Sequence, residues 1–307
     1  MKKRSIPVLL GVVFSAVVLT GCYQKGKLRE IHFEDVVQAD AAAEEGKYAE
    51  LNVCVGSMIT PREGYAYYKA LLDYVGEKLG MKVNFIERES YAEVNALLEA
   101  GKIDVAFVCG GPYVDGKEKF GLELLAAPRV DGKTVYHSYV IARKNASINM
   151  FDDLKGKTFV FVDPLSNTGK IYPDYVLKQA GATPDTYFKE YVYSYAHDTS
   201  IRAVAEGFVD AGAVDSLIWN YLDRNGSPYT KQLKIIKVSP PYGIPPVVVR
   251  PALDAELKGR IKNVLLSMHS DSRGREILDS MFIDRFAVID DSDYDSIREM
   301  KKDLNRQ

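Results

Sequence analysis

A cluster of small polar residues stands where a strand-like segment gives way to a helix-like one. In the stretch FVDPLSNTGKIYPDYVL, residues 161–177, an apolar run ends and a helical pattern begins a few residues later. The residues between the two patterns include Ser166, Asn167, Thr168 and Gly169. A helix N-terminus leaves up to about four backbone N–H groups unpaired and carries about half a positive charge. Such a segment can bind an anion, and it also suits ordinary helix capping.

Two further candidates fall at the ends of predicted elements. In AHDTSIRAVAEGFVDAGAVDS, residues 196–216, His197 precedes an amphipathic helical pattern, and a strand pattern ends at Asp215. Both side chains could therefore face a cleft. The alternatives are that His197 is a turn residue and that Asp215 is the N-cap of the next helix.

Weaker candidates follow the first and third predicted strands. After the first strand come Ser57, Met58 and Thr60. These residues could line a cleft or form a plain strand-to-helix loop. After the third strand come Cys109, Gly110 and Gly111. Paired glycines allow another group to approach the backbone closely.

Strands and helices alternate twice along the chain. The first half predicts strands at 51–56, 82–87 and 103–108, with helices at 64–79 and 91–101. This βαβαβ order implies a parallel sheet with right-handed crossovers. The second half predicts strands at 157–163 and 208–214, with helices at 169–180 and 216–224.

Two extended segments predict crossings between the halves. Residues 134–144 could cross from one lobe to the other, and residues 233–249, rich in proline, could cross back. Helices are expected within 254–303. The sequence thus predicts an α/β protein with the two-lobed clamshell plan of a type 2 periplasmic binding protein, each lobe holding a mostly parallel sheet flanked by helices. The expected boundaries are 50–140 and 243–307 for lobe 1, and 141–242 for lobe 2.

The N-terminal segment has the pattern of a lipoprotein leader. Three basic residues precede a short apolar run that is too short to span a membrane comfortably. The run ends in LTGC, which resembles a bacterial lipobox, so residues 1–21 are expected to be a signal peptide and Cys22 the lipidated residue. Residues 22–49 are polar and are expected to be a tether. An ordinary signal peptide with a chance cysteine is the alternative.

Net charge and cysteine content exclude several classes of function. The 307 residues carry a net charge of −2, which argues against a general nucleic-acid binder. Cys54 and Cys109 lie in apolar strand patterns, and we expect both to be small buried side chains; an exported protein also permits a disulfide between them. The sequence shows no metal-binding Cys or His spacing, and no cofactor or metal is expected.

Four motifs in order resemble one family. They are DVAFVCGGPYV, DPLSNTG, HDTSIRAVAEGFVDAGAVDS and PPYGIPPVVVRPAL. Together they look like the phosphate, phosphite and phosphonate substrate-binding proteins of ABC importers, over roughly residues 50–290. The ligand-binding positions that this resemblance implies are Tyr91, Tyr136, Ser166, Asn167, Thr168, His197 and Asp215. Asn167 departs from the family pattern, in which a hydroxyl residue is common. Asp215 would accept a proton from a P–OH group or pair with a ligand amine.

The resemblance implies a transport receptor. An enzyme is not expected, because the four His residues are scattered and Ser166 has no matched base. Its expected ligand is a small phosphorus oxyanion, and its expected partners are an ABC permease and its ATPase. The protein is expected to be a monomer held by lipid on the extracytoplasmic side of a membrane. That side is the periplasm in a diderm host and the outer face of the plasma membrane in a monoderm host. A sensory module of the same fold, reporting to a membrane kinase or chemoreceptor, is the alternative.

Overall fold

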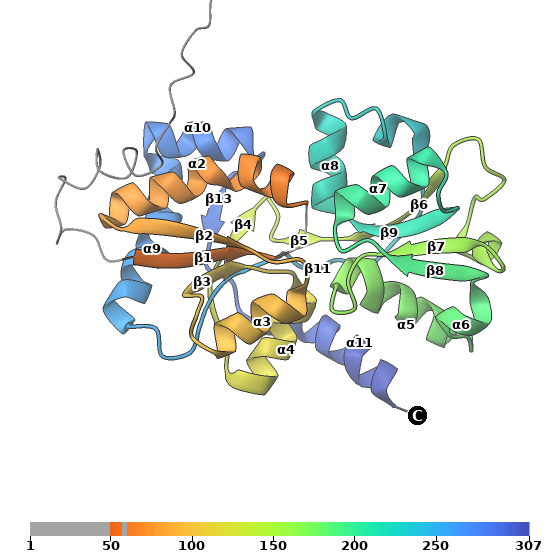
Figure 1. Ribbon diagram of the computed structural model, residues 1–307, viewed down its shortest axis with the longest axis horizontal. Helices are drawn as coiled ribbons and strands as arrows, with labels where there is room; N and C mark the ends of the chain where they lie inside the picture. Colours follow the sequence, from red (N-terminus) through yellow and green to blue (C-terminus); the bar gives the residue numbers. More distant parts are fainter. Residues whose placement is uncertain (1–49, 57–59, 307) are drawn as a thin grey trace, which may run out of the picture. The chain divides into compact units, whose positions relative to one another are not determined.

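Two mixed β-sheets with flanking helices organise the part of the chain that the structure describes (Figure 1). The structure is a computed structural model, and it describes residues 50–56 and 60–306. These residues belong to one compact unit. The predicted signal peptide, the lipidation of Cys22, the tether, and the candidates Ser57 and Met58 lie outside the described residues.

The first sheet has six strands in the order β13–β4–β12–β3–β1–β2. Its strands are β1 (Glu50–Val55), β2 (Lys82–Glu87), β3 (Val105–Phe107), β4 (Glu123–Arg129), β12 (Val247–Val249) and β13 (Arg285–Ala287). β1 pairs in parallel with β2 and β3, and the other neighbours are antiparallel. The predicted βαβαβ unit is therefore confirmed in β1, β2 and β3.

The second sheet has five strands in the order β10–β6–β9–β7–β8. Its strands are β6 (Ser138–Arg143), β7 (Thr158–Phe161), β8 (Glu190–Tyr193), β9 (Ala211–Asp215) and β10 (Leu233–Val238). β7 pairs in parallel with β8 and β9, whereas β6 is antiparallel to β9 and β10. Two short strands lie in the segments of chain that connect the two sheets. They are β5 (Val135–Tyr136) and β11 (Tyr242–Gly243), and they pair with each other in antiparallel fashion.

The α/β class is confirmed, but the prediction of mostly parallel sheets is wrong because both sheets are mixed. The crossing segments supply two of the antiparallel strands, β6 and β12. β12 follows the second crossing and enters the first sheet antiparallel to β3, and β6 follows the first crossing and enters the second sheet antiparallel to β9. A strand joins a parallel neighbour only through a crossover connection of a dozen or more residues, usually a helix. β6 and β12 instead follow β5 and β11 directly, with no helix between them.

Helices follow most of the strands. The helices are α2 (Pro61–Leu79), α3 (Tyr91–Glu99), α4 (Gly110–Phe120), α5 (Tyr172–Gln179), α6 (Pro184–Tyr187), α7 (His197–Glu206), α8 (Ser216–Arg224), α9 (Ala255–Ser267), α10 (Ser272–Ser280) and α11 (Asp295–Asn305). Short 3-10 turns are η1 (Phe151–Leu154), η3 (Thr230–Gln232), η4 (Met268–Ser270) and η5 (Asp291–Tyr294), and η2 (Asn167–Ile171) is a π-helical turn. No helix in the described part of the chain is both long and apolar enough to span a bilayer.

The predicted helices form where their apolar periodicity puts one face in the core. Leu71, Leu72, Val75 and Leu79 of α2 are buried. The helix stops at Gly80, as predicted, because this residue adopts a φ of 67°, which costs glycine little. Cys54 and Cys109 are also buried as predicted, and both thiols are free.

The last helix contacts helices that flank both sheets. α11 packs against α4, which follows β3, and against α5, which follows β7. The ammonium of Lys178 in α5 donates to the backbone carbonyl of Asp303 over 2.6 Å. The C-terminal helix therefore links two helices whose N-terminal segments belong to the predicted site.

Candidate ligand-binding site

Most of the predicted site residues lie at the start of helices that follow strands, whereas Tyr136 lies in β5. Tyr91 is the first residue of α3, and His197 is the first residue of α7. Cys109, Ser166 and Asp215 are the N-caps of α4, η2 and α8. In α/β sheets the carboxyl ends of the strands form the usual ligand site. The strand-to-helix order thus places each of these side chains at such an edge.

Hydrogen bonds join candidates that come from different elements. The side-chain Nδ2 of Asn167 donates to the hydroxyl of Tyr136 over 3.2 Å, and this hydroxyl lies 3.3 Å from the thiol of Cys109. Nearby, a carboxylate oxygen of Asp163 accepts the backbone N–H of Tyr91 over 3.1 Å. The start of η2 is therefore tied to the ends of β2 and β3 through side chains of the candidate site.

His197 and Asp215 are in direct contact. The backbone N–H of Asp215 donates to Nδ1 of His197 over 2.9 Å. Asp215 also lies opposite Ser138 in the pairing of β9 with β6, and the hydroxyl of Ser138 donates to the backbone carbonyl of Thr168 over 2.6 Å. Ser138 thus connects this pair to the segment 166–169.

The contact with Asp215 fixes the proton on His197. Since Nδ1 accepts a hydrogen bond, the proton of the neutral ring is on Nε2. Burial lowers the pKa of His197 to about 3, so the ring is neutral across the physiological range. The buried Nε2–H is a donor with no partner among the described residues.

Three other candidate residues in the described part of the chain also have a buried polar atom without a hydrogen-bond partner. Within the described residues, the side-chain oxygens of Tyr91, Asn167 and Thr168 are buried and have no hydrogen-bond partner. Buried polar atoms are paired in the great majority of cases. Four unpaired polar atoms on predicted site residues therefore fit a small polar ligand, to which hydroxyl and imidazole groups can donate.

Asp215 is both a helix cap and a proton-binding group. Its Oδ1 accepts the backbone N–H of Leu217 over 2.6 Å, so its predicted capping role is confirmed. Burial raises the pKa of Asp215 to about 7, although the backbone N–H groups of α8 oppose this shift. The carboxyl group is therefore partly protonated near neutral pH.

The remaining ionisable groups of the site stay protonated. Burial is the main cause that raises the pKa values of Tyr91, Tyr136 and Cys109, and the charge of Asp215 adds to each shift. Neutral hydroxyl and imidazole donors therefore surround one carboxyl group that titrates near pH 7.

The segment 166–169 combines capping with close packing. The hydroxyl oxygen of Ser166 accepts the backbone N–H of Gly169 over 3.0 Å, so Ser166 caps the turn. A Cβ on Gly169 would lie 2.6 Å from the side chain of Val162, so packing requires this glycine. Asn167 uses its Nδ2 on Tyr136. Thr168 has its hydroxyl unpaired among the described residues.

The weaker candidates connect parts of the protein to one another. The backbone N–H and the hydroxyl of Thr60 donate to the carboxylate of Asp198 in α7 over 3.0 and 2.8 Å. A Cβ on Gly110 would lie 2.5 Å from the side chain of Ile297 in α11. The donors of Thr60 and the space at Gly110 are thus used within the protein.

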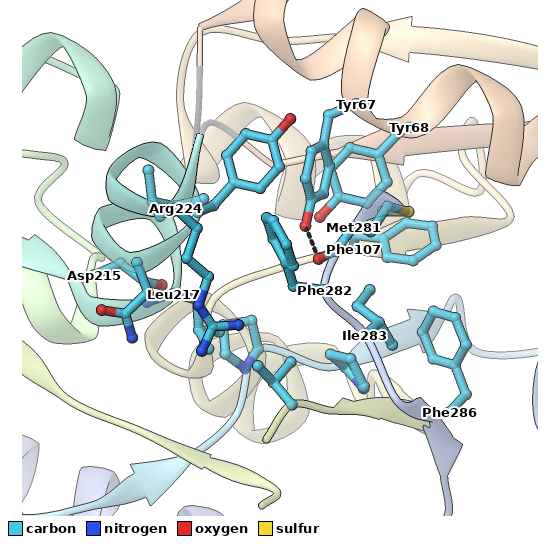
Figure 2. A pocket seen from close by; sticks show the side chains of 16 residues that line it. Tyr67, Tyr68, Phe107, Asp215, Leu217, Arg224, Met281, Phe282, Ile283 and Phe286 are labelled. Atoms are coloured by element: carbon cyan, nitrogen blue, oxygen red, sulfur yellow. Dashed lines mark hydrogen bonds between the residues drawn. The ribbon is translucent and has the colours of Figure 1, made fainter. Parts of the chain in front are cut away.

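An apolar cavity that Asp215 helps to line was not predicted from the sequence. We call this space the apolar cavity, and Phe107, Leu217, Ile218, Met281, Phe282 and Phe286 contribute to its lining. Figure 2 shows Asp215 and Leu217 on one side, with Met281, Phe282 and Ile283 across from them. These residues come from α8, β3, β13 and the segment before β13, and no local sequence pattern connects them.

A family profile identifies the class of protein to which the chain belongs. The profile described as "ABC transporter, phosphonate, periplasmic substrate-binding protein" matches residues 54–294. The chain belongs to this family. The resemblance seen in the four sequence motifs is thereby confirmed.

Known proteins similar to this phosphonate-family binding protein are named for phosphate import and phosphite binding. The phosphate-import protein PhnD of Mycolicibacterium smegmatis is 32% identical over 184 residues, which are 56% of this chain and 57% of that protein. The probable ABC transporter phosphite binding protein PhnD1 of Prochlorococcus marinus is 24% identical over 76% of this chain and 82% of that protein. A solved structure of PhnD1 with methylphosphonate has a TM-score of 0.76 at 22% identity, covering 84% of this chain and 99% of that structure. This likeness confirms the periplasmic binding protein fold.

Gly111 of this phosphonate-family protein gives a test of the close packing around the site. A Cβ at Gly111 would lie 2.0 Å from the backbone carbonyl oxygen of Leu165. Gly111→Ala should therefore force α4 away from the segment before η2 and lower the free energy of unfolding by about 1–3 kcal/mol, measured by urea denaturation. The matched control is Gly259→Ala in α9, where a Cβ would meet no atom within 4 Å. This control should gain about 0.5–1 kcal/mol, and equal stability of the two variants would contradict the prediction.

Proposed function

We propose that the chain is an extracytoplasmic substrate-binding protein of an ABC importer, and that it binds a phosphorus oxyanion among the site residues from both lobes. The observation that carries this proposal is the set of unpaired buried donors on Tyr91, Thr168 and His197, beside which the unpaired amide oxygen of Asn167 can accept a P–OH proton. Hydrogen bonds to an ionised oxyanion are roughly twice as strong as those between neutral groups. Relatives named for phosphate import and phosphite binding support the same ligand class.

The seven-residue ligand set remains part of this proposal. We call it the oxyanion site, and its members are Tyr91, Tyr136, Ser166, Asn167, Thr168, His197 and Asp215. Tyr136 acts by orienting Asn167, to which it is hydrogen-bonded. Asp215 supplies or accepts the single proton that it shares with the ligand, since its pKa lies near 7.

The proposed cellular setting follows from the sequence. Residues 1–21 would be the signal peptide, Cys22 the lipidated N-terminus and residues 22–49 the tether. Lobe 1 would comprise 50–140 and 243–307, and lobe 2 would comprise 141–242. A lipid-anchored monomer of this kind would deliver its ligand to a permease and its ATPase by hinge closure of the two lobes.

The site is better suited to binding than to catalysis. His197 would be a poor general base at neutral pH because its pKa is about 3. The hydroxyl oxygen of Ser166 accepts a hydrogen bond from the backbone N–H of Gly169, which is a capping contact and does not activate it as a nucleophile. Among the described residues, no group of three or more His, Cys, Asp or Glu side chains could hold a metal ion.

Thermal unfolding with candidate oxyanions tests the proposed function. Phosphite, phosphate or methylphosphonate at 100 times its dissociation constant should stabilise the full chain by about 2.7 kcal/mol. For a protein of this size, that corresponds to a rise in melting temperature of about 5 °C. Sulfate is the control, because it has no proton to share with Asp215 at neutral pH. If no phosphorus oxyanion raises the melting temperature, the proposed function is wrong.

A further inference from the structure

The apolar cavity has walls that suit a hydrocarbon group. Aromatic and aliphatic side chains from α8, β3 and the 281–286 segment surround it. The edge-to-face pair of Tyr67 and Tyr221, with ring centroids 4.7 Å apart, contributes to its lining. The cavity volume is about 70 Å³, several times the roughly 10–15 Å³ that one water needs. It therefore has room for an organic group of a few heavy atoms.

This cavity adjoins the oxyanion site at Asp215. Asp215 belongs to both, since it contacts His197 and also lines the cavity. Tyr68 lines the cavity as well, and burial together with the charge of Asp215 raises the pKa of its hydroxyl. A ligand with its oxyanion at His197 would thus direct any substituent past Asp215 into apolar surroundings.

One charged side chain, Arg224, also lines the cavity. The guanidinium of Arg224 lies over the ring of Phe282, 5.3 Å from its centroid (Figure 2). It also pairs with the carboxylate of Asp131. The apolar walls would strip water from an ammonium group, which costs far more than removing water from a hydrocarbon group. An uncharged substituent is therefore the better match than an ammonium group.

We propose that the apolar cavity binds the organic substituent of the ligand. The ligand is then an organic phosphoryl oxyanion, R–PO₃ or R–O–PO₃, in which R is a short uncharged hydrocarbon group. This inference rests on the proposed function, because it requires the oxyanion to bind beside Asp215. It goes further by distinguishing an organophosphonate or a phosphate monoester from inorganic phosphate and phosphite, which would leave the cavity walls without a partner.

Calorimetric titration of the full chain with a ligand series tests this inference. The series is phosphite, methylphosphonate, ethylphosphonate, propylphosphonate, ethyl phosphate and 2-aminoethylphosphonate. Each added methylene that fits should lower the dissociation constant about fourfold. Ethyl phosphate and propylphosphonate have similar shapes, so their comparison separates a phosphate ester from a phosphonate as the source of the phosphoryl group. The compound 2-aminoethylphosphonate has the size of propylphosphonate and should bind more weakly than it.

A variant that fills the cavity provides an independent measurement. Val130 lines the cavity outside the oxyanion site, and Val130→Phe should abolish the preference for propylphosphonate over phosphite. Val192→Phe is the matched control, because Val192 is 46% exposed on β8 and should retain the wild-type preference. Ile218→Phe fills the same cavity from α8 and replaces Val130→Phe if that variant does not fold.

The outcomes separate this inference from the proposed function. Equal affinity for phosphite and all the alkylphosphonates, or an unchanged preference in the variant that fills the cavity, overturns the inference and leaves the proposed function standing. Tighter binding of 2-aminoethylphosphonate than of propylphosphonate overturns it in favour of an amine paired with Asp215. Binding of none of these compounds overturns both.

Discussion

His197→Asn is expected to weaken binding of the phosphorus oxyanion by about 10- to 150-fold. Asparagine places an acceptor near the position of Nδ1, so it can still accept the backbone N–H of Asp215, which now donates to His197 over 2.9 Å. It has no donor at the position of Nε2, which is buried and unpaired among the described residues. A hydrogen bond to a charged group contributes about 1.5–3 kcal/mol, which corresponds to the stated loss of affinity. Calorimetric titration with the ligand found by thermal unfolding measures it.

The complementary variant is His197→Gln. Its longer side chain can place an amide N–H near the Nε2 position, but it leaves the backbone N–H of Asp215 without an acceptor. His197→Gln should therefore retain more affinity than His197→Asn and lose about 1–3 kcal/mol of stability. A third histidine variant, His269→Gln in η4, controls for substitution away from the site. Wild-type affinity in His197→Asn would show that Nε2–H does not contact the ligand.

Local periodicity was sufficient to predict much of the fold. The strands β1 and β2 and the helices α2 and α3 were predicted because their apolar residues recur with strand or helix spacing. The missed elements lack such a pattern. α4 begins with Gly110, Gly111 and Pro112, which indicate a turn in isolation, although the first turn of a helix tolerates them. β13 has three residues and is fixed by pairing with β4, more than 150 residues earlier in the chain.

The positions of site residues could be predicted where a side chain directly follows the end of a strand. His197 and Asp215 were predicted to face a common region, and the structure places them in contact. The role of Asn167 required the structure, because its Nδ2 bonds to Tyr136 on a different element. The apolar cavity was not predictable for the same reason. Phe107 and Phe282 stand far apart in the sequence and meet only in the folded protein.

Asp215→Asn is expected to remove the pH dependence of ligand affinity between about pH 7 and 9. The pKa of Asp215 is about 7, and the second ionisation of a phosphate monoester is near 6. At higher pH, the carboxylate and the dianionic ligand repel each other, so the wild-type complex must take up one proton that the two then share. Uptake of one proton makes affinity fall about tenfold per pH unit above both pKa values. His197 and the site tyrosines do not contribute, since His197 is already neutral and the tyrosine pKa values are raised.

The same substitution, Asp215→Asn, should stabilise the ligand-free protein above neutral pH. Burial raises the pKa of Asp215 from 3.8 to about 7 in the folded state, so folding disfavours the ionised form. The associated loss of stability is absent below pH 3.8, grows as the pH rises to about 7 and reaches about 4 kcal/mol. Asparagine can still accept the N–H of Leu217 as an N-cap. Asp215→Asn should therefore be more stable than wild type at pH 8 and similar to it at pH 4.

A second aspartate cap makes the comparison specific to Asp215. Asp254 caps α9 through the backbone N–H of Leu257 and is exposed to solvent. Asp254→Asn should leave both the affinity profile and the stability profile unchanged. If Asp215→Asn keeps the wild-type slope of affinity against pH, the shared proton lies elsewhere. The variant could instead lose the pH dependence of affinity while keeping the stability of the wild type at pH 8. In that case Asp215 takes up its proton only when ligand binds, and the prediction that its burial destabilises the free protein is wrong.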